Sequence, residues 1–362
     1  MPINYDKPLF YITLAFFIGG LLILASASMV LSQKAFGMSG YYVLRQSLFG
    51  GLGGVIGFFI ASRIPYRFWK KAAIPLMICS LIFMAVLFLP GFGYSFGGAR
   101  RWISVGPLSF QPSEILKFSF WVYLAGWLEA RKNDVVSVSR GMIPFAFMLS
   151  VIGIFLLMQP DIGTLGVIVV SAGLLYFLGG GKTSQIITLV LFGAAAFYFI
   201  VQLAPYRLAR ITAFLNPAAD PQGIGYQINQ AFIAIGSGGF WGRGFGMSLQ
   251  KYQYLPESMG DSIFAIFSEE FGFFGSAIFI GLWGVFLLRG FSIARRAPDL
   301  FGKFLAAGII MGITVQSFIN MAAISGLMPL TGIPLPFVSY GGTALMVTLI
   351  QIGVLLNIAK HT

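Results

Sequence analysis

Four of the 11 acidic residues of this chain lie in one short stretch, LPESMGDSIFAIFSEEFGFFG, at residues 255–275. Glu257 and Asp261 precede an apolar run, and Glu269 and Glu270 lie about two helical turns inside it. Carboxylates in such places can act as general acids or bases, hold a metal ion, or neutralise buried cations. The stretch thus holds acids suited to chemistry and acids suited to pairing inside the fold.

Cysteine and histidine chemistry is nearly absent from the chain. Cys79, the only cysteine, lies inside an apolar run, and the only histidine, His361, is the penultimate residue. These counts exclude disulfides, iron–sulfur clusters and thiolate zinc sites. A reaction carried by this chain must use carboxylates, lysines, arginines, hydroxyls or a metal held by carboxylates.

The composition is that of a polytopic membrane protein. Apolar residues make up 57% of the chain and charged residues 9%, with a mean hydropathy of +0.87, whereas soluble domains are about a quarter charged. Because a bilayer-spanning helix takes about 20 residues, we expect an all-α fold of about ten transmembrane helices that form a single integral membrane domain, 1–362. The predicted spans are 9–31, 43–61, 72–89, 114–130, 141–158, 164–178, 185–203, 262–288, 304–326 and 343–358. The sixth is short and the eighth is long, which allows tilt or re-entrance at both, and the glycine spacing at 50–57 favours close helix packing.

The basic residues predict the orientation. Most of the 23 Lys and Arg residues fall in short loops on the cytoplasmic side if the N-terminus is cytoplasmic, as the positive-inside rule requires. Both termini are therefore predicted to be cytoplasmic, and the net charge of +12 does not indicate nucleic acid binding. One long extracytoplasmic loop, about 204–261, connects the seventh and eighth helices, and long loops commonly carry function. Most of the other basic residues lie in or near this loop and the segment 90–117, where we expect them to meet an anion.

The segment GARRWISVGPLSFQPSEILKF, residues 98–118, contains two charged features. Arg101 and Trp102, next to Arg100, form a basic and aromatic cluster suited to a phosphate and its headgroup. Glu114 and Lys117 lie three residues apart on one helix face, so they can form an ion pair. This pair is either purely structural or part of a binding site.

Other candidates lie further along the chain. Asp161, in MQPDIGT at 158–164, either caps a helix or faces a polar cavity. Arg210, Arg243 and Lys251 lie in a segment rich in glycine and aromatic residues that can cradle a sugar. The segment GIPLPFVSYGG at 332–342 is a second extracytoplasmic region, because proline and glycine at membrane depth are tolerated where the backbone lines a cavity.

These stretches together resemble the SEDS family (shape, elongation, division and sporulation), which includes FtsW, RodA and SpoVE, and they are most similar to its FtsW branch. The resemblance rests on GARRWISVGPLSFQPSE, QPDIGT, NPAADPQGIGYQINQAFIAIGSGGFWGRGFG, QKYQYLPESMGDSIFAIFSEEFGF and LTGIPLPFVSYGG, and it runs from about residue 10 to 358. It implies a peptidoglycan glycosyltransferase of the bacterial cytoplasmic membrane that polymerises lipid II on the outer face, in cell division or cell-shape maintenance. It also implies a class B penicillin-binding transpeptidase and other divisome or elongasome proteins as partners. Ser258, Met259 and Gly260 stand where many division members have Ala-His-Thr, so the choice between division and elongation stays open.

The resemblance defines the chemistry that the candidate residues must perform. A sugar hydroxyl of one lipid II attacks the anomeric carbon of another and expels pyrophosphate, which requires one general base and positive charge around the leaving group. Asp261 is the predicted base, with Glu257 in a supporting role, and one of Glu269 and Glu270 is expected to pair with a buried cation. The predicted substrate-binding residues are Arg101, Trp102, Glu114, Lys117, Asp161, Arg210, Arg243, Lys251 and Glu257. Among them, Arg210, Arg243 and Lys251 are expected to hold the pyrophosphate.

The metal and the function each have alternatives. The resemblance suggests Mg²⁺ or Mn²⁺ between pyrophosphate and Asp161 or another carboxylate, but no ligand spacing in the sequence identifies a metal site. A lipid II flippase is the alternative function, although it needs charges along a path through both halves of the membrane, and here they favour the outer half. A non-catalytic scaffold for division proteins is a further alternative.

Overall fold

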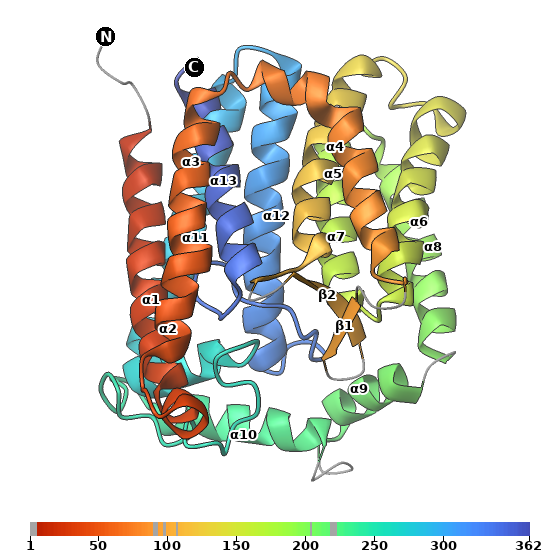
Figure 1. Cartoon of the computed structure of the whole chain (residues 1–362). Coiled ribbons are helices and arrows are strands. Elements are labelled where there is room, and N and C mark those ends of the chain that lie inside the picture. Colours follow the sequence, from red (N-terminus) through yellow and green to blue (C-terminus); the bar gives the residue numbers. More distant parts are fainter. Residues whose placement is uncertain (1–5, 90–92, 97–98, 106–107, 203–204, 218–222) are drawn as a thin grey trace.

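The computed structural model describes residues 6–89, 93–96, 99–105, 108–202, 205–217 and 223–362. Within these ranges, all ten predicted spans are helical (Figure 1). Eight helical segments are long and apolar enough to cross a membrane, and α7 is a shorter apolar helix. The tenth, α5, has 19 residues and carries Glu114, Lys117 and Glu129. The chain is therefore a multi-pass helical membrane protein, as predicted.

The spans follow one another in chain order. They are α1 (Lys7–Phe36), α2 (Tyr41–Arg45) joined through the π-helical turn η1 (Gln46–Leu52) to α3 (Gly53–Arg63), α4 (Arg67–Val86), α5 (Pro112–Ala130), η2 (Val138–Met142) joined to α6 (Ile143–Met158), α7 (Ile162–Leu178), α8 (Thr183–Gln202), α11 (Ile263–Arg296), α12 (Leu300–Ile324) and α13 (Gly342–Ala359). The start of α1 and the end of α13 lie at the same end of the bundle (Figure 1).

Two connections that were predicted to be loops contain regular secondary structure. The described part of the segment 204–261 holds two helices, α9 (Pro205–Leu215) and α10 (Ile224–Ser237), which cross the bundle at the end opposite the start of α1, here called the α9–α10 end (Figure 1). The strands β1 (Gly93–Phe96), β2 (Ala99–Val105) and β3 (Leu108–Phe110) form a small antiparallel sheet in the order β1-β2-β3. Short amphipathic helices lie along a membrane surface rather than across it, and α9 and α10 contain no apolar run long enough to indicate a span.

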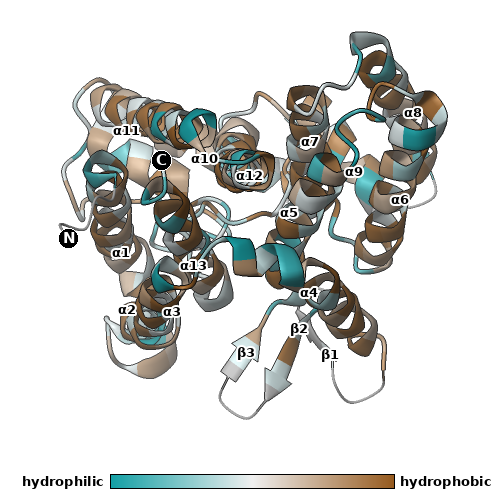
Figure 2. Cartoon of the chain, turned by 90° about the horizontal axis from the view of Figure 1, so that it is seen from above, coloured by the Kyte–Doolittle hydropathy of each residue, from teal (hydrophilic) through white to brown (hydrophobic). Residues whose placement is uncertain are grey.

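α12 and α13 are the most buried spans, and α8 lies at the rim of the bundle (Figure 2). Glycines let η1 and α3 approach α13 closely, since a Cβ on Gly50 of η1 would lie 2.9 Å from Gly342 Cα and one on Gly54 of α3 would lie 2.6 Å from Leu349 Cδ1. The close packing predicted from the glycine spacing at 50–57 is thus confirmed. This packing fixes the start of α13 and thereby the end of the preceding segment, 325–341, which contributes residues to the candidate active site.

α11 is broken at Gly272, where φ is +67° and ψ is −167°. Ser276 Oγ donates to Ser268 Oγ at 3.0 Å, and the rings of Phe267 and Phe279 lie 4.9 Å apart. Twelve residues of unbroken helix would separate two α carbons by about 18 Å. Residues 263–271 therefore fold back against 273–296 as a re-entrant half-helix, and the re-entrance considered for the predicted span 262–288 is confirmed.

The loop 239–244 fills this break. Its amides at 243 and 244 donate to the carbonyls of residues 269 and 270, each at 3.0 Å, and its carbonyls at 239 and 240 accept from the amides of residues 273 and 274 at 2.9 and 3.0 Å. A Cβ on Gly272 would lie 2.3 Å from Gly242 N, so a glycine is needed for this approach. The backbone groups freed by the break are thus paired by protein, as a membrane interior requires.

Candidate active site

Asp261 lies at the start of the re-entrant half-helix, next to the N-cap residue Ser262. Gln227, on α10, donates from Nε2 to Asp261 Oδ1 at 3.3 Å and to Ser262 Oγ at 2.9 Å. Desolvation by the surrounding protein, with the nearby negative charge of Glu257, raises the pKa of Asp261 to about 6, while the positive charge of Arg210 opposes the rise. A carboxylate with this pKa is ionised at neutral pH and basic enough to accept a proton in a reaction.

A fixed positive charge from α9 lies close to this carboxylate. Arg210 donates from Nη1 to the carbonyls of Leu330 and Thr331 at 3.1 and 3.2 Å, which holds the guanidinium against the segment 325–341. Gly332 has a φ of +70°, and a Cβ built on it would lie 3.6 Å from Arg210 Nη2 and 4.0 Å from Asp261 Oδ2. The guanidinium and the carboxylate therefore converge on one small space beside the backbone of Gly332.

Glu257 forms the turn that leads to Asp261. Its carbonyl accepts from the amides of Gly260 and Ser262 at 2.9 and 3.2 Å, and its φ is +51°. Desolvation raises the pKa of the Glu257 carboxyl. The structure places Glu257 near Asp261, where its charge raises the basicity of that carboxylate.

The ion pair predicted on α5 is present and buried. Lys117 Nζ lies 2.8 Å from Glu114 Oε1 and also donates to Gln316 Oε1, on α12, at 2.5 Å. Gln316 Nε2 in turn donates to the carbonyl of Pro334 at 2.9 Å. Gln316 thus connects the ion pair by hydrogen bonds to the segment 325–341, which contains Gly332.

Asp161 is the N-cap residue of α7, which confirms one of the two alternatives predicted for it. Its Oδ1 accepts from the amide of Thr164 at 3.2 Å. Its Oδ2 is buried and has no hydrogen-bond partner among the residues that the structure describes. The first turn of α7 packs against the site segment, since a Cβ on Gly163 would lie 2.4 Å from Ile333 Cγ2.

Arg101 and Trp102 lie on β2. Arg101 donates from Nε to the carbonyl of Gln159 at 3.2 Å and from Nη2 to the carbonyl of Pro160. The Arg101 guanidinium therefore lies against carbonyl groups at the C-terminal end of α6, where a positive charge is favourable. Trp102 is half-buried. The structure brings Arg101 to the turn before Asp161, and no described contact joins it to Asp261.

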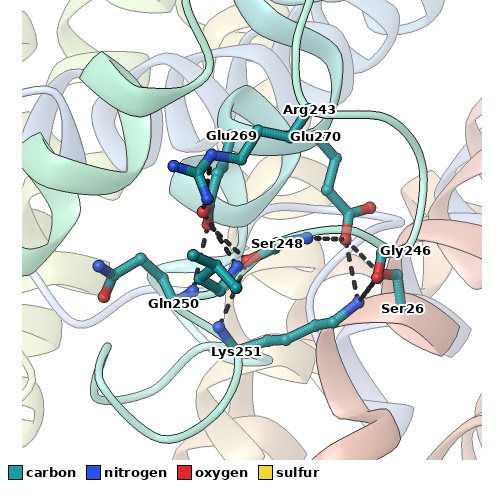
Figure 3. A network of polar contacts seen from close by, with 9 residues as sticks. Ser26, Arg243, Gly246, Ser248, Gln250, Lys251, Glu269 and Glu270 are labelled. Carbon is teal, nitrogen blue, oxygen red and sulfur yellow. Dashed lines mark hydrogen bonds and ion pairs between the residues drawn. The ribbon is translucent and has the colours of Figure 1, made fainter.

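Lys251 belongs to a second, buried polar network at the break in α11 (Figure 3). Its Nζ lies 3.2 Å from Glu270 Oε1 and donates to Ser26 Oγ on α1 at 3.0 Å and to the carbonyl of Gly246 at 2.5 Å. The Lys251 side chain has no exposed surface, so its charge is compensated within the protein. The pairing expected for one of the two glutamates is confirmed at Glu270, while the predicted role of Lys251 in holding pyrophosphate gains no support from this placement.

Glu269 holds the loop on the other side of the same network (Figure 3). Its carboxylate accepts from Ser248 Oγ at 2.5 Å and from the amides of Leu249 and Gln250 at 3.0 and 3.3 Å. Arg243 Nε lies 3.7 Å from Glu269 Oε1, and the Arg243 side chain remains 37% exposed. Of the three cations predicted in the long loop, the structure therefore brings Arg210 to Asp261 and places Arg243 and Lys251 at the break.

Four polar residues of the site were not predicted from the sequence, namely Gln227, Gln316, Asn320 and Ser339. Gln316 and Asn320 lie four residues apart in an apolar span and so share one helix face. Uncharged polar groups inside a span usually bond to a neighbouring segment. The spacing of Gln316 and Asn320 therefore indicates which face of α12 lies against the site.

The whole described chain matches one protein family. Residues 6–362 match the FtsW/RodA/SpoVE family of cell cycle proteins. Stage V sporulation protein E of Bacillus subtilis is 41% identical over 357 residues, which cover 99% of this chain and 97% of that protein. The probable peptidoglycan glycosyltransferase FtsW of Geobacter sulfurreducens is 38% identical over 359 residues, which cover 99% and 96%. The chain belongs to the FtsW/RodA/SpoVE family.

Solved structures share the fold over the full length. The rod shape determining protein RodA of Thermus thermophilus superposes with a TM-score of 0.73 at 26% identity and covers 99% of this chain and 97% of its own. A chain of a peptidoglycan synthase complex, whose structure concerns the coordination of polymerization and crosslinking, gives a TM-score of 0.79 at 27% identity and covers 99% and 98%. The predicted family and the predicted polytopic fold are both confirmed.

Proposed function

We propose that this chain polymerises lipid II into glycan strands and that Asp261 is the general base of the reaction. The chain is a glycosyltransferase of the class for which its FtsW relatives are named. The observation that supports the base is the convergence of the Asp261 carboxylate, with its pKa near 6, and the Arg210 guanidinium on the space beside Gly332. Polymer formation from purified lipid II in detergent tests the activity, and the Asp261 variant described in the Discussion tests the base.

The reaction balances with one carboxylate and one fixed cation. Asp261 takes the proton of the attacking sugar hydroxyl, and the hydroxyl oxygen forms the bond to the anomeric carbon of the second lipid II. The bond between that carbon and the pyrophosphate oxygen breaks, and the electron pair leaves with pyrophosphate. Arg210 stabilises the charge that grows on this leaving group. Pyrophosphate leaves without being protonated, so no second carboxyl group is needed as an acid.

A divalent cation fits the site only as a partner of the substrate. Among the described residues, no group of three or more His, Cys, Asp or Glu side chains could enclose an ion. The buried Asp161 Oδ2, which lacks a partner there, is the oxygen that would hold Mg²⁺ or Mn²⁺, with phosphate oxygens and water as the other ligands. The cation would add positive charge around the pyrophosphate.

Arg210 offers a direct test of the leaving-group cation. Arg210→Ala should lower lipid II turnover roughly ten- to a hundredfold, because a charge-assisted hydrogen bond contributes about 1.5–3 kcal/mol. Since Arg210 opposes the rise in the pKa of Asp261, its loss should also move the acid limb of the pH–rate profile to higher pH.

Arg207→Ala is the matched control for Arg210, because Arg207 lies one turn earlier on α9 and also donates to two carbonyls, those of Ile200 and Leu157. It should remain close to wild type in both measurements. Equal losses of lipid II turnover in the two variants would show that the arginines of α9 contribute to folding and not to the reaction.

We further propose that the α9–α10 end faces outward in the bacterial cytoplasmic membrane, where the chain works with a class B penicillin-binding transpeptidase. In a Cys79→Ser background, a cysteine at Tyr254, which is 57% exposed, should react with a membrane-impermeant maleimide on intact cells. A cysteine at Ser139, exposed at the other end, should react only after the membrane is opened. The opposite labelling would place the site on the cytoplasmic side.

A further inference from the structure

Three successive backbone carbonyls lead into the re-entrant half-helix, and each is held by the segment between α12 and α13 or by α12 itself. The carbonyl of residue 259 accepts from the amide of Tyr340 at 2.8 Å. The carbonyl of residue 260 accepts from Ser339 Oγ at 2.6 Å. The carbonyl of Asp261 accepts from Asn320 Nδ2 at 2.9 Å. The backbone that carries the base is thus attached at every residue to one neighbouring surface.

Asn320 differs from the other two donors because it binds both sides of the site. Its Nδ2 also donates to the carbonyl of Ile333 at 2.8 Å, so one amide group joins the backbone of Asp261 to the backbone beside Gly332. Both partners are carbonyls, which requires the amide nitrogen, and not the oxygen, to point toward them. Asn320 is 2% exposed, and its Oδ1 has no hydrogen-bond partner within the described ranges.

The same helix face continues this attachment toward α5. Gln316, one turn before Asn320, donates to the carbonyl of Pro334 and accepts from Lys117. The carbonyls of residues 333 and 334 are therefore each bound by an amide side chain of α12. This face joins three parts of the site, namely the buried ion pair of α5, the segment held by Arg210, and Asp261.

We propose that Asn320 is a positioning residue that fixes the Asp261 carboxylate relative to Arg210 by binding the backbone of residues 261 and 333 with one amide. Its side chain contacts the base only through the main chain, so it takes no proton and holds no substrate. The proposal rests on the proposed function, because it concerns the geometry of that general base. A base must be held within about 0.5 Å of its productive position, and an error of about 1 Å can cost about a hundredfold in rate.

The test compares two buried asparagines of α12 and α13. Asn320→Leu keeps the volume but removes the donor, and it should lower kcat for lipid II polymerisation about 10- to 100-fold with KM changed by less than about threefold. Asn357→Leu is the matched control, since Asn357 is also buried and also binds two backbone groups, Tyr66 N and Ser62 O, far from the site along α13. It should lower the melting temperature to a similar extent and leave kcat unchanged.

The pH–rate profile separates positioning from a general loss of stability. The charged groups that act on Asp261 are Glu257, which raises its pKa, and Arg210, which lowers it, and both remain in the variant. Looser backbone admits water to the carboxylate, so its pKa should fall toward the ordinary value. The acid limb of Asn320→Leu should therefore move below that of the wild type, whereas the limb of Asn357→Leu should not move.

A double variant tests the coupling directly. If Asn320 acts only through Asp261, then Asn320→Leu combined with Asp261→Asn should be no slower than Asp261→Asn alone. Additive losses would overturn the proposal, as would wild-type kcat in Asn320→Leu, even with the base assignment intact. Wild-type rate in Asp261→Asn would instead overturn the proposed base.

Should Asn320→Leu fail to insert, Ser339→Ala provides a second test, because it removes the neighbouring hydrogen bond to the carbonyl of residue 260. It should show the same loss of kcat and the same direction of shift in the acid limb. An unchanged kcat and an unchanged acid limb in Ser339→Ala would count against the proposal.

Discussion

Replacing Asp261 by asparagine is expected to lower the rate of lipid II polymerisation about 10²–10⁴-fold, the usual contribution of a positioned general base. Asparagine keeps the shape of the side chain and can still accept a hydrogen bond from Gln227, but its amide cannot take the proton of a sugar hydroxyl. Membrane level and melting temperature should stay near the wild-type values. The measurement is the rate at which labelled lipid II enters polymer in detergent, and a wild-type rate would assign the base to another group.

Glu257→Gln is the control for this experiment and should give a milder loss. Removing the Glu257 charge takes away one of the causes that raise the pKa of Asp261, so the acid limb of the rate should move to lower pH. In the wild type that limb should lie near pH 6, because the base is protonated and inactive below its pKa and ionised above it. A flat rate between pH 5 and 7 would contradict the assignment.

Replacing Lys251 by methionine is expected to destabilise the protein by about 3–5 kcal/mol, the usual cost of removing one partner of a buried ion pair. The variant leaves the Glu270 carboxylate buried at 2% side-chain exposure without its cation. The loss should appear as a lower melting temperature in detergent and less protein in the membrane. Lys34→Met is the control, because Lys34 binds Gln253 of the same loop at 2.8 Å on the exposed surface and should change stability little.

A double variant distinguishes this structural role from the pyrophosphate contact predicted from the sequence. Lys251→Met combined with Glu270→Gln removes both buried charges and should regain most of the stability and most of the polymerisation rate. If Lys251 instead held the leaving group, the double variant would fold and still turn over slowly. Stability that does not recover would show that the network depends on Glu270 for its bonds to Ser26 and Ser248 as well as for its charge.

The spans were predictable because the bilayer imposes their length and composition, and each of the ten predicted segments coincides with a helix in the part of the chain that the structure describes, with ends that differ by a few residues. α9 and α10 were not, since their apolar residues lie on one face and no long apolar run marks them. Asp261 and its supporting Glu257 were correctly expected to lie together. A buried cation was expected beside one of Glu269 and Glu270, but its identity as Lys251 was not predicted, because the network joins Ser26, Lys251 and Glu270 from three separate segments, a pairing that no local pattern contains. The pair of Glu114 and Lys117 was predicted because a spacing of three positions places two side chains on one helix face, which is a local pattern in the sequence.

The re-entrant half-helix also contributes an electrostatic field of its own. A helix carries about half a positive charge at its N-terminus, and residues 263–271 begin beside Asp261, while their last carbonyls are bonded to the loop 239–244. The positive end of this backbone dipole is therefore directed at the place where pyrophosphate would leave. Unlike Arg210, it has no side chain to remove and no proton to lose, so part of the attraction for an anion should persist in every side-chain variant of the site and at every pH at which the fold survives.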